Sequence, residues 1–210
     1  IITAIVTSKN KTVSDMNHTK KQTITNSTKG SIRIIAGKHR GRKLPVLMAE
    51  GLRPTTDRVK ETVFNWLMPY VQEANCLDCF AGSGSLGFEA MSRGAQKVTL
   101  LELNKTAVNQ LKANKQLLNA ESINIDQVDT LEYLKTNIEA YDLIFLDPPF
   151  RKQLVEQCAM LLNSGWLTEN AVIYVEMEAN DNCQQLPNNW TLLKEKIAGQ
   201  VSYQLYQYQG

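Results

Sequence analysis

The fold is decided by the stretch Cys76-Leu77-Asp78-Cys79-Phe80-Ala81-Gly82-Ser83-Gly84-Ser85-Leu86-Gly87. It predicts a short buried strand, a glycine loop and then a helix that ends at Gly94. Gly82, Gly84 and Gly87 match the G-x-G-x-x-G spacing of dinucleotide-binding loops, in which the ligand lies at the N-terminus of the helix. The chain is therefore expected to be an α/β protein with a Rossmann-like, mostly parallel sheet.

Two acids indicate which ligand this loop would take. Glu102 ends the next predicted strand, at the spacing of an acid that binds ribose hydroxyls; the alternative is a solvated acid at a strand end. Asp78 ends the first strand, where a pyrophosphate would meet its carboxylate. A ligand with an ammonium or sulfonium group suits this position better. S-adenosylmethionine carries both groups and no phosphate, so we expect it, rather than NAD, as the cofactor.

A second motif, Asp147-Pro148-Pro149-Phe150, follows the apolar run 143–146. The run predicts a buried parallel strand, and two prolines cannot continue its ladder. Ligands of open α/β sheets bind at this carboxyl end of the strands. Asp147 and the Pro148 carbonyl can accept hydrogen bonds from an –NH2 group, while Phe150 can stack on the ring that carries it. The alternative is a simple turn with Asp147 as a turn residue.

These two motifs together resemble class I methyltransferases that act on an exocyclic amine. The stretches 32–37, 40–45 and 51–67 make the chain similar to the RsmD family of bacterial 16S ribosomal RNA guanine-N2 methyltransferases. The resemblance extends from about Ser31 to the C-terminus. It implies methyl transfer from S-adenosylmethionine to N2 of a specific guanine, in the 16S RNA of the small (30S) ribosomal subunit. It also implies a cytoplasmic enzyme, and we expect a monomer that needs no metal and no membrane.

The resemblance further implies roles for individual residues. The catalytic residues would be Asp147, Pro148, Pro149 and Phe150. The cofactor would be bound by Asp78, Phe80, Ala81, Gly82, Ser83, Gly84, Glu102, Leu103, Asp129, Thr130 and Asp147. In this assignment a Cβ in the glycine loop would collide with the methionine portion of the cofactor. Asp129 is expected either to accept from the adenine amine or to cap the helix that follows it.

Charge is divided unevenly along the chain. Residues 1–60 hold thirteen Lys and Arg against three Asp and Glu, and residues 61–210 hold ten against eighteen, although the net charge is only +2. Such asymmetry indicates a nucleic-acid-binding arm on an acidic body. We expect a flexible, solvated basic tail over 1–30, an RNA-docking hairpin over 31–54 and the methyltransferase domain over 55–210. The residues expected to contact RNA are Arg33, Lys38, Arg40, Arg42, Lys43, Arg53, Thr55 and Arg58.

Hydrophobic periodicity predicts alternating strands and helices along the rest of the chain. The predicted helices are 56–68, 105–119, 130–138 and 152–163. The predicted strands are 75–79, 97–103, 122–128, 141–146 and 171–177, followed by an antiparallel hairpin of 190–197 and 201–208. The family resemblance implies seven strands in the order 3-2-1-4-5-7-6, with a small basic hairpin added at the N-terminus.

Cys76 and Cys79 have C-x-x-C spacing, but without a second pair we interpret them as strand residues rather than zinc ligands.

Two other functions stay open: an amino methyltransferase acting on DNA adenine N6, and an RNA-binding protein with a vestigial cofactor fold. The absence of a target-recognition domain argues against the first, and the intact motif acids argue against the second.

Overall fold

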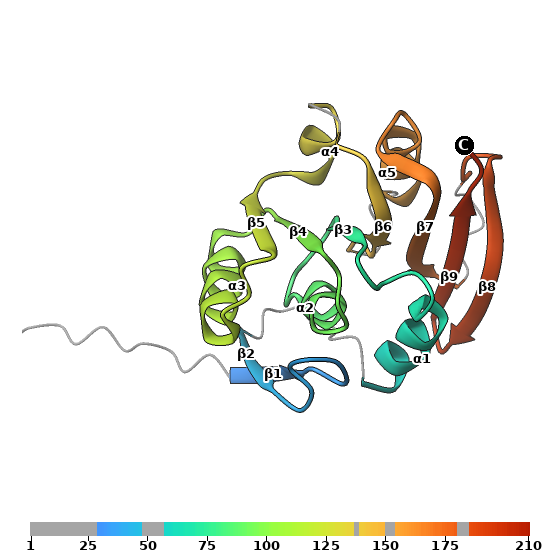
Figure 1. The fold of residues 1–210 in the computed structure, drawn as a ribbon. Coiled ribbons are helices and arrows are strands. Elements are labelled where there is room, and N and C mark those ends of the chain that lie inside the picture. The colour runs from blue at the N-terminus through green and yellow to red at the C-terminus, as the bar shows by residue number, and fades with distance from the viewer. Residues whose placement is uncertain (1–28, 48–56, 137–138, 150–153, 180–184) are drawn as a thin grey trace, which may run out of the picture.

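A seven-stranded sheet forms the centre of the molecule (Figure 1). The structure, a computed structural model, describes residues 29–47, 57–136, 139–149, 154–179 and 185–210. The strands are β3 (Asn75–Asp78), β4 (Lys97–Glu102), β5 (Ile123–Gln127), β6 (Tyr141–Leu146), β7 (Leu167–Glu178), β8 (Trp190–Ala198) and β9 (Val201–Tyr208). Their order is β5-β4-β3-β6-β7-β9-β8, with β9 antiparallel to both of its neighbours. Counted within this sheet, that order is the predicted 3-2-1-4-5-7-6.

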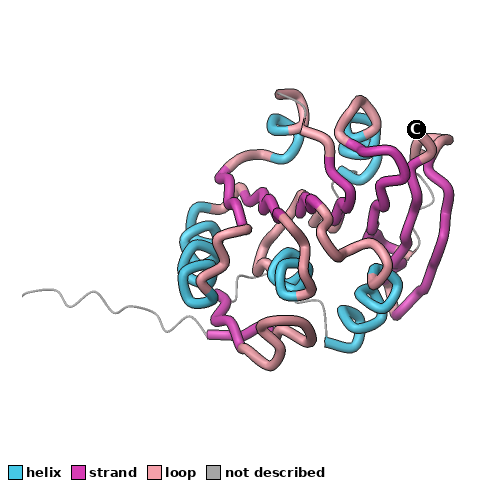
Figure 2. Tube along the Cα trace, in the orientation of Figure 1, coloured by secondary structure: helices cyan, strands magenta, loops and turns pink. Residues whose placement is uncertain are grey.

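Helices cover both faces of the sheet (Figure 2). One face carries α1 (Asp57–Leu67), α2 (Ser85–Ser92) and α3 (Lys105–Leu118), and the other carries α4 (Thr130–Tyr133) and α5 (Leu154–Leu162). The strands are apolar on both sides for this reason. In β6, Phe145 packs into the cluster below α1 and α2, whereas Ile144 and Leu146 pack towards α5.

An antiparallel hairpin forms an extra layer outside α2 and α3, as predicted. It consists of β1 (Lys29–Arg33) and β2 (Lys43–Leu47). Ile32 and Leu44 alternate with exposed basic residues and are buried in the same core cluster as the helices. The hairpin is therefore part of the core and not a detached arm.

One buried carboxylate joins the hairpin to α1 and α2. Glu89, in the middle of α2, is fully buried. Its side-chain oxygens accept the backbone N–H groups of Ile35 and Ala36 at 2.8 and 3.0 Å. Arg93 Nε donates to Glu89 at 2.8 Å, and Lys60 Nζ of α1 lies 3.7 Å away. A buried charge needs such partners, because desolvation costs more than a single contact returns.

The hairpin turn also covers the C-terminus of α2. Lys38 N–H donates to the Ser92 carbonyl, and His39 N–H donates to the Ser92 hydroxyl, which itself donates to the Ala36 carbonyl. Gly37 has a φ of +79°, and a Cβ there would lie 1.7 Å from the Ser92 carbonyl oxygen. Only glycine allows this approach, so the turn is held rigidly against the helix end.

Most predicted elements match the structure to within two residues, but the helix predicted over 130–138 is too long. The α-helix ends at Tyr133. Beyond it, Lys135 N–H and Thr136 N–H bond to carbonyls three residues back, which is the tighter geometry that often ends a helix. The chain must then turn to begin β6, so the apolar periodicity does not continue as a helix.

β7 is longer than the predicted strand 171–177. It begins at Leu167, which pairs with Tyr141, and the register then shifts before Leu143. Polar residues occupy this first part of the strand, and the Thr168 hydroxyl bonds to Asp142 of β6 at 2.8 Å. This part of the strand has no apolar pattern because Thr168 hydrogen-bonds to β6 and the next two residues, Glu169 and Asn170, are exposed.

The cysteine prediction also agrees with the structure. Cys76 lies in β3 and Cys79 directly follows it, and both are buried free thiols. Burial raises the pKa of both thiols, which keeps them protonated and unreactive. Among the described residues, no helix is both long and apolar enough to cross a bilayer.

Replacing Glu89 should test whether its carboxylate holds the hairpin in place. Glu89→Gln should lower the free energy of unfolding by about 3–5 kcal/mol, because the Lys60 and Arg93 charges lose their buried counterion. Urea denaturation followed by circular dichroism measures this. Glu132→Gln is the control, since Glu132 pairs with Lys135 on the surface and should change stability by less than about 1 kcal/mol. Equal effects in both variants would show that Glu89 is not a structural constraint.

Candidate active site

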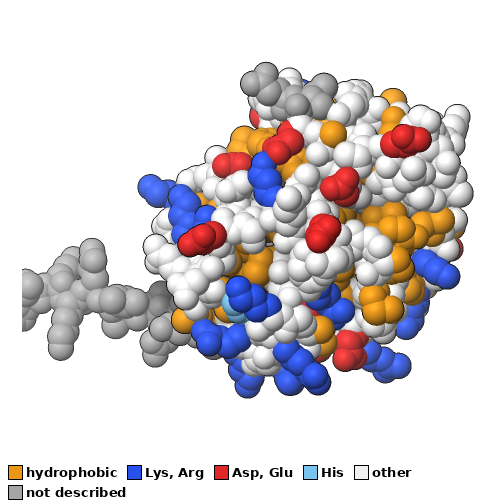
Figure 3. Space-filling model, viewed as in Figure 1, with side chains coloured by type: hydrophobic (Ala, Val, Ile, Leu, Met, Phe, Trp, Pro, Cys, Tyr) orange, Lys and Arg blue, Asp and Glu red, His pale blue; other side chains and the backbone are white. Residues whose placement is uncertain are grey.

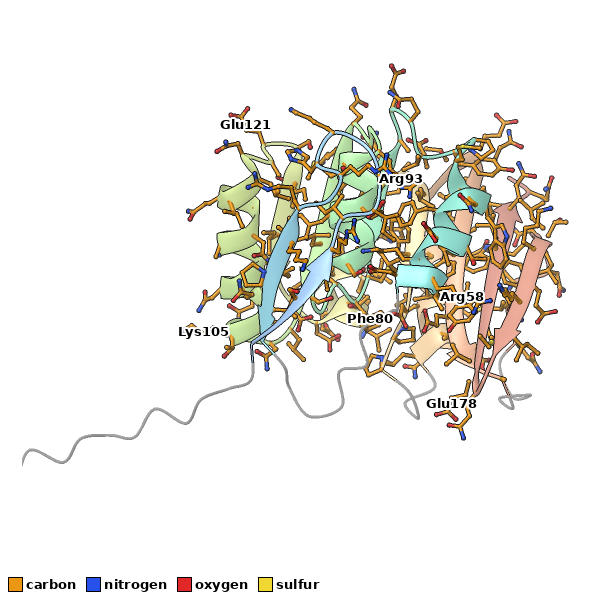
Figure 4. All side chains as sticks on the ribbon, turned by 90° about the horizontal axis from the view of Figure 1, so that it is seen from below. Arg58, Phe80, Arg93, Lys105, Glu121 and Glu178 are labelled. Carbon is orange, nitrogen blue, oxygen red and sulfur yellow. The ribbon has the colours of Figure 1, made fainter. Side chains whose placement is uncertain are left out.

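Three acids of the sequence motifs lie along one edge of the sheet. Asp78 ends β3, Glu102 ends β4 and Asp147 follows β6, and these three strands are parallel neighbours. Their carboxyl ends therefore meet at the same edge, beside the N-terminus of α2. Figure 4 shows this edge below, near the labelled Phe80 and Lys105, with Arg93 and Glu121 at the opposite edge.

Glu102 holds the glycine loop in shape. Its Oε2 accepts Gly82 N–H at 2.9 Å and its Oε1 accepts Asn104 N–H at 2.7 Å. A carboxylate has about four lone-pair positions, so each oxygen can still accept another hydrogen bond. The carboxylate predicted to bind ribose hydroxyls is thus fixed by two backbone groups before any ligand binds.

Asp78 is a buried carboxyl group between the sheet and α2. Its carboxylate accepts the backbone N–H groups of Gly87 and Phe80, which favour the charged form. Burial is the stronger influence and raises the pKa of Asp78 to about 7. A Cβ on Gly87 would lie 2.2 Å from Leu100 and 3.3 Å from the Asp78 carboxylate, so this glycine lets α2 approach the acid closely.

The N-terminus of α2 lacks a side-chain cap. Gly84 occupies the N-cap position in the left-handed region, with a φ of 77°. In the part of the chain that the structure describes, Ser85 Oγ is the buried side-chain atom without a hydrogen-bond partner. Backbone N–H groups and a hydroxyl are therefore available there for an anionic group such as a carboxylate.

Core packing by itself requires glycine at position 84; the expected collision of a Cβ with the cofactor stays a prediction. A Cβ at this position would lie 2.6 Å from the Phe88 ring and 2.7 Å from Leu111, which are core side chains. The left-handed backbone conformation adds a second requirement for glycine. The loop is thus shaped by the packing of α2 against α3.

Three other residues predicted to bind the cofactor, Asp129, Thr130 and Leu103, lie after β4 and β5. Asp129 Oδ1 accepts Leu131 N–H at 2.9 Å and also accepts from the next residue, so Asp129 caps α4. The Thr130 hydroxyl donates to the Cys79 carbonyl, which ties α4 to the end of β3. Leu103 is 63% exposed directly after Glu102 and presents an apolar surface at this edge.

Asp147 lies half-buried at the centre of this edge. Burial raises its pKa well above the usual aspartate range, and the charges of Glu176 and Asp78 raise it further. Pro148 is buried and Pro149 is exposed. Phe150, Arg53 and Thr55 lie outside the described residues, so their predicted roles remain predictions.

Sequence reasoning missed three polar residues: Ser85, Glu89 and Glu176. Glu89 and Glu176 are single acids within otherwise apolar buried segments, and that interruption was the available signal. Ser85 carried no signal, because serine is common at the start of a helix. Its importance comes from burial without a partner.

Figure 3 shows Lys and Arg side chains gathered at the lower part of the molecule, where Figure 1 shows the hairpin. The side chains of Arg33, Lys38, Arg40 and Lys43 are exposed, as is that of Arg58 at the start of α1. Arg42 is exposed as well, but its guanidinium also donates to the Leu117 carbonyl near the C-terminus of α3 at 3.2 Å. The turn lies beside Ser92, about 10 Å along α2 from the glycine loop.

The raised pKa of Asp78 predicts how stability depends on pH. Because the folded-state pKa of about 7 exceeds the ordinary aspartate value of 3.8, the folded state binds a proton between these values that the unfolded state lacks. The Asp78 contribution should therefore be present below about pH 4 and be lost as pH rises through 7. The free energy of unfolding should fall from pH 5 to pH 8, and Asp78→Asn should make this fall smaller by at least about 1 kcal/mol.

Urea denaturation at pH 5 and pH 8 measures this difference. Asp126→Asn, which changes an exposed acid of β5, should keep the wild-type difference between the two pH values. An Asp78→Asn variant with the wild-type difference would contradict the conclusion that burial raises the pKa of Asp78 to about 7.

Comparisons with known proteins agree with this geometry. A sequence model of the family described as conserved hypothetical protein 95 matches residues 32–207. The ribosomal RNA small subunit methyltransferase D of Haemophilus influenzae is 58% identical, over 89% of this chain and 99% of that protein. The protein of the same name from Escherichia coli is 49% identical, over 86% of this chain and 92% of that protein.

A solved structure supports the same assignment. The Escherichia coli protein yhhF, named as a methyltransferase, matches with a TM-score of 0.80 and 46% identity, over 86% of this chain and 99% of that one. The sheet order and this neighbour show the class I methyltransferase fold. With its glycine loop and edge acids in place, the chain belongs to the family of ribosomal RNA small subunit methyltransferase D.

Proposed function

We propose that this chain transfers a methyl group from S-adenosylmethionine to N2 of one guanine, of the guanine-966 type, in 16S ribosomal RNA of the small subunit. The observation that carries the proposal is the edge where Asp78, Glu102 and Asp147 surround the uncapped start of α2. Relatives named ribosomal RNA small subunit methyltransferase D support the substrate class.

The residues at this edge fit S-adenosylmethionine, which supplies an electrophilic methyl group on a sulfonium. The α2 N–H groups and the orphaned Ser85 hydroxyl would bind the methionine carboxylate. Asp78 would face the ammonium group, and an ammonium there would lower the pKa of this buried acid again. Glu102 would accept from the ribose hydroxyls through its remaining lone pairs. Leu103, with Asp129 and Thr130, would lie on the adenine side.

Asp147 and the Pro148 carbonyl would act on the acceptor amine. The lone pair of guanine N2 is delocalised into the ring, so the amine is a weak nucleophile. Two acceptors on its two protons favour a pyramidal nitrogen whose lone pair is aimed at the methyl group. Asp147 can receive the proton that the nitrogen loses, because burial and neighbouring acids raise its pKa. The site works mainly by positioning and electrostatics.

The basic hairpin would bind RNA phosphates while one base enters the acidic edge. Phosphate contacts position a nucleic acid without reading its sequence. The exposed cations of the turn are held to α2 through Glu89 and Ser92. They therefore keep a fixed position relative to the glycine loop at the other end of that helix. The target base would leave its stack to reach the site.

Methyl transfer from labelled S-adenosylmethionine tests the proposed function. The chain is incubated with small subunits, with 16S RNA or with DNA, and the nucleosides are identified after digestion. We expect N2-methylguanosine at one position of 16S RNA. Asp147→Ala should lower the rate on the order of 100-fold or more while largely sparing cofactor binding, because the carboxylate's main partner is the acceptor amine. Methylated adenine in DNA, or normal turnover by Asp147→Ala, would contradict the proposal.

Replacing three exposed cations tests the docking role of the hairpin. Lys38→Ala, Arg40→Ala and Lys43→Ala together should raise the apparent KM for the RNA substrate and flatten its salt dependence, because fewer counterions are released. Arg42 is left intact, since its contact with Leu117 is structural. Cofactor affinity should not change.

A charge-matched control carries Lys135→Ala, Lys194→Ala and Lys196→Ala, which removes one exposed lysine from the turn after α4 and two from β8, away from the hairpin. It should keep the wild-type KM and salt dependence. Equal KM values for the two triple variants would show that the hairpin is only a solvated surface.

A further inference from the structure

β7 carries one buried acid beside Asp147. Glu176 is 8% exposed and follows Val175, which pairs with Leu146 of β6. Asp147 follows Leu146, so the two acids occupy neighbouring positions on adjacent strands, whose axes are about 4.8 Å apart. The Glu176 charge acts on the Asp147 carboxyl group, which agrees with this placement.

Glu176 lies on the side of the sheet that faces α1 and α2. Tyr174, two residues earlier, packs into the core cluster on that side with Phe145. The Tyr174 hydroxyl donates to Glu176 Oε2 at 3.0 Å. Asp78, which is paired with Phe145 and touches α2 at Gly87, lies on this side as well. Glu176 thus extends the row of acids by one strand, and Tyr174 orients its carboxylate.

The Watson–Crick edge of guanine suits two such acids. Its N1–H donor lies directly beside the N2 amine, so the edge presents only donors at these two positions. If the Asp147 carboxylate and the Pro148 carbonyl accept hydrogen bonds from the N2 amine, the neighbouring N1–H needs its own acceptor. Adenine presents a lone pair at N1, which a carboxylate would repel.

We infer that Glu176 accepts the N1–H of the target guanine and makes this site selective for guanine over bases with an N1 lone pair. This inference rests on the proposed guanine-N2 activity and names the residue that reads the base. A buried acceptor that binds the N–H of one base rejects a base without that N–H, because the acceptor is then left without a hydrogen bond and faces a lone pair. Glu176 is then a specificity-determining residue.

The test uses 2,6-diaminopurine, which keeps the 2-amino group of guanine but has a lone pair at N1. Small-subunit RNA is prepared with guanine or 2,6-diaminopurine at the position that the wild-type chain methylates. The kcat/KM of each substrate is measured with labelled S-adenosylmethionine. Wild type should prefer guanine on the order of 10- to 100-fold. Glu176→Gln should bring this ratio close to one, since the glutamine amide can donate to the N1 lone pair.

Two further variants separate base reading from folding. Tyr174→Phe removes the hydroxyl that orients Glu176 and should lower the ratio part of the way, even if Glu176→Gln fails to fold. Asp142→Asn makes the same carboxylate-to-amide change at the amino end of β6 and should keep the wild-type ratio. Thermal unfolding and cofactor titration check that each variant is folded.

The outcomes distinguish this inference from the function on which it rests. A wild-type chain that methylates guanine N2 but treats both substrates alike would overturn the inference and leave the function standing. An unchanged ratio in folded Glu176→Gln would also overturn it and leave Glu176 as a structural partner of Tyr174. A wild-type chain that methylates neither base would overturn the proposed function itself.

Discussion

The carboxylate of Glu89 is the constraint on which the arrangement of this molecule depends. It is fully buried, and its partners come from the hairpin turn, from α1 and from α2 itself. Burial lowers the pKa of Lys60, and the Glu89 charge opposes that shift, so each charge is tolerable only because of the other. The middle of α2 thus fixes the hairpin, while the N-terminus of the same helix lies beside the acids of the candidate site.

The glycine loop illustrates how packing and ligand binding share the same residues. Gly84 and Gly87 are needed because Cβ atoms would strike Phe88 and Leu100 in the core. The close packing they allow brings α2 down onto Asp78 and leaves the Ser85 hydroxyl buried without a partner. A helix N-terminus and a buried acid then lie side by side, and under the proposed function they would bind the two charged ends of the methionine portion of the cofactor.

The separation of acidic and basic surfaces explains how the molecule could bind RNA phosphates and a target base in the proposed RNA complex. The candidate site is lined by acids, which repel phosphate, whereas Lys38 and Arg40 lie exposed on the hairpin turn at the other end of α2. A base that carries amine donors can enter the acidic edge while its phosphate chain stays near the hairpin. The proposed complex would therefore use opposite charges for RNA binding and for chemistry, on separate surfaces of the molecule.

The sequence by itself determined the elements, the sheet order through family resemblance, and the acids at the strand ends. Glycine spacing and apolar runs are local signals, so they could be read without the structure. Only the tertiary structure decided that Glu89 anchors the hairpin and that Glu176 lies beside Asp147. These contacts depend on strand register and on the approach of helices to the sheet. Both are set by packing between segments far apart in the chain, which no local pattern records.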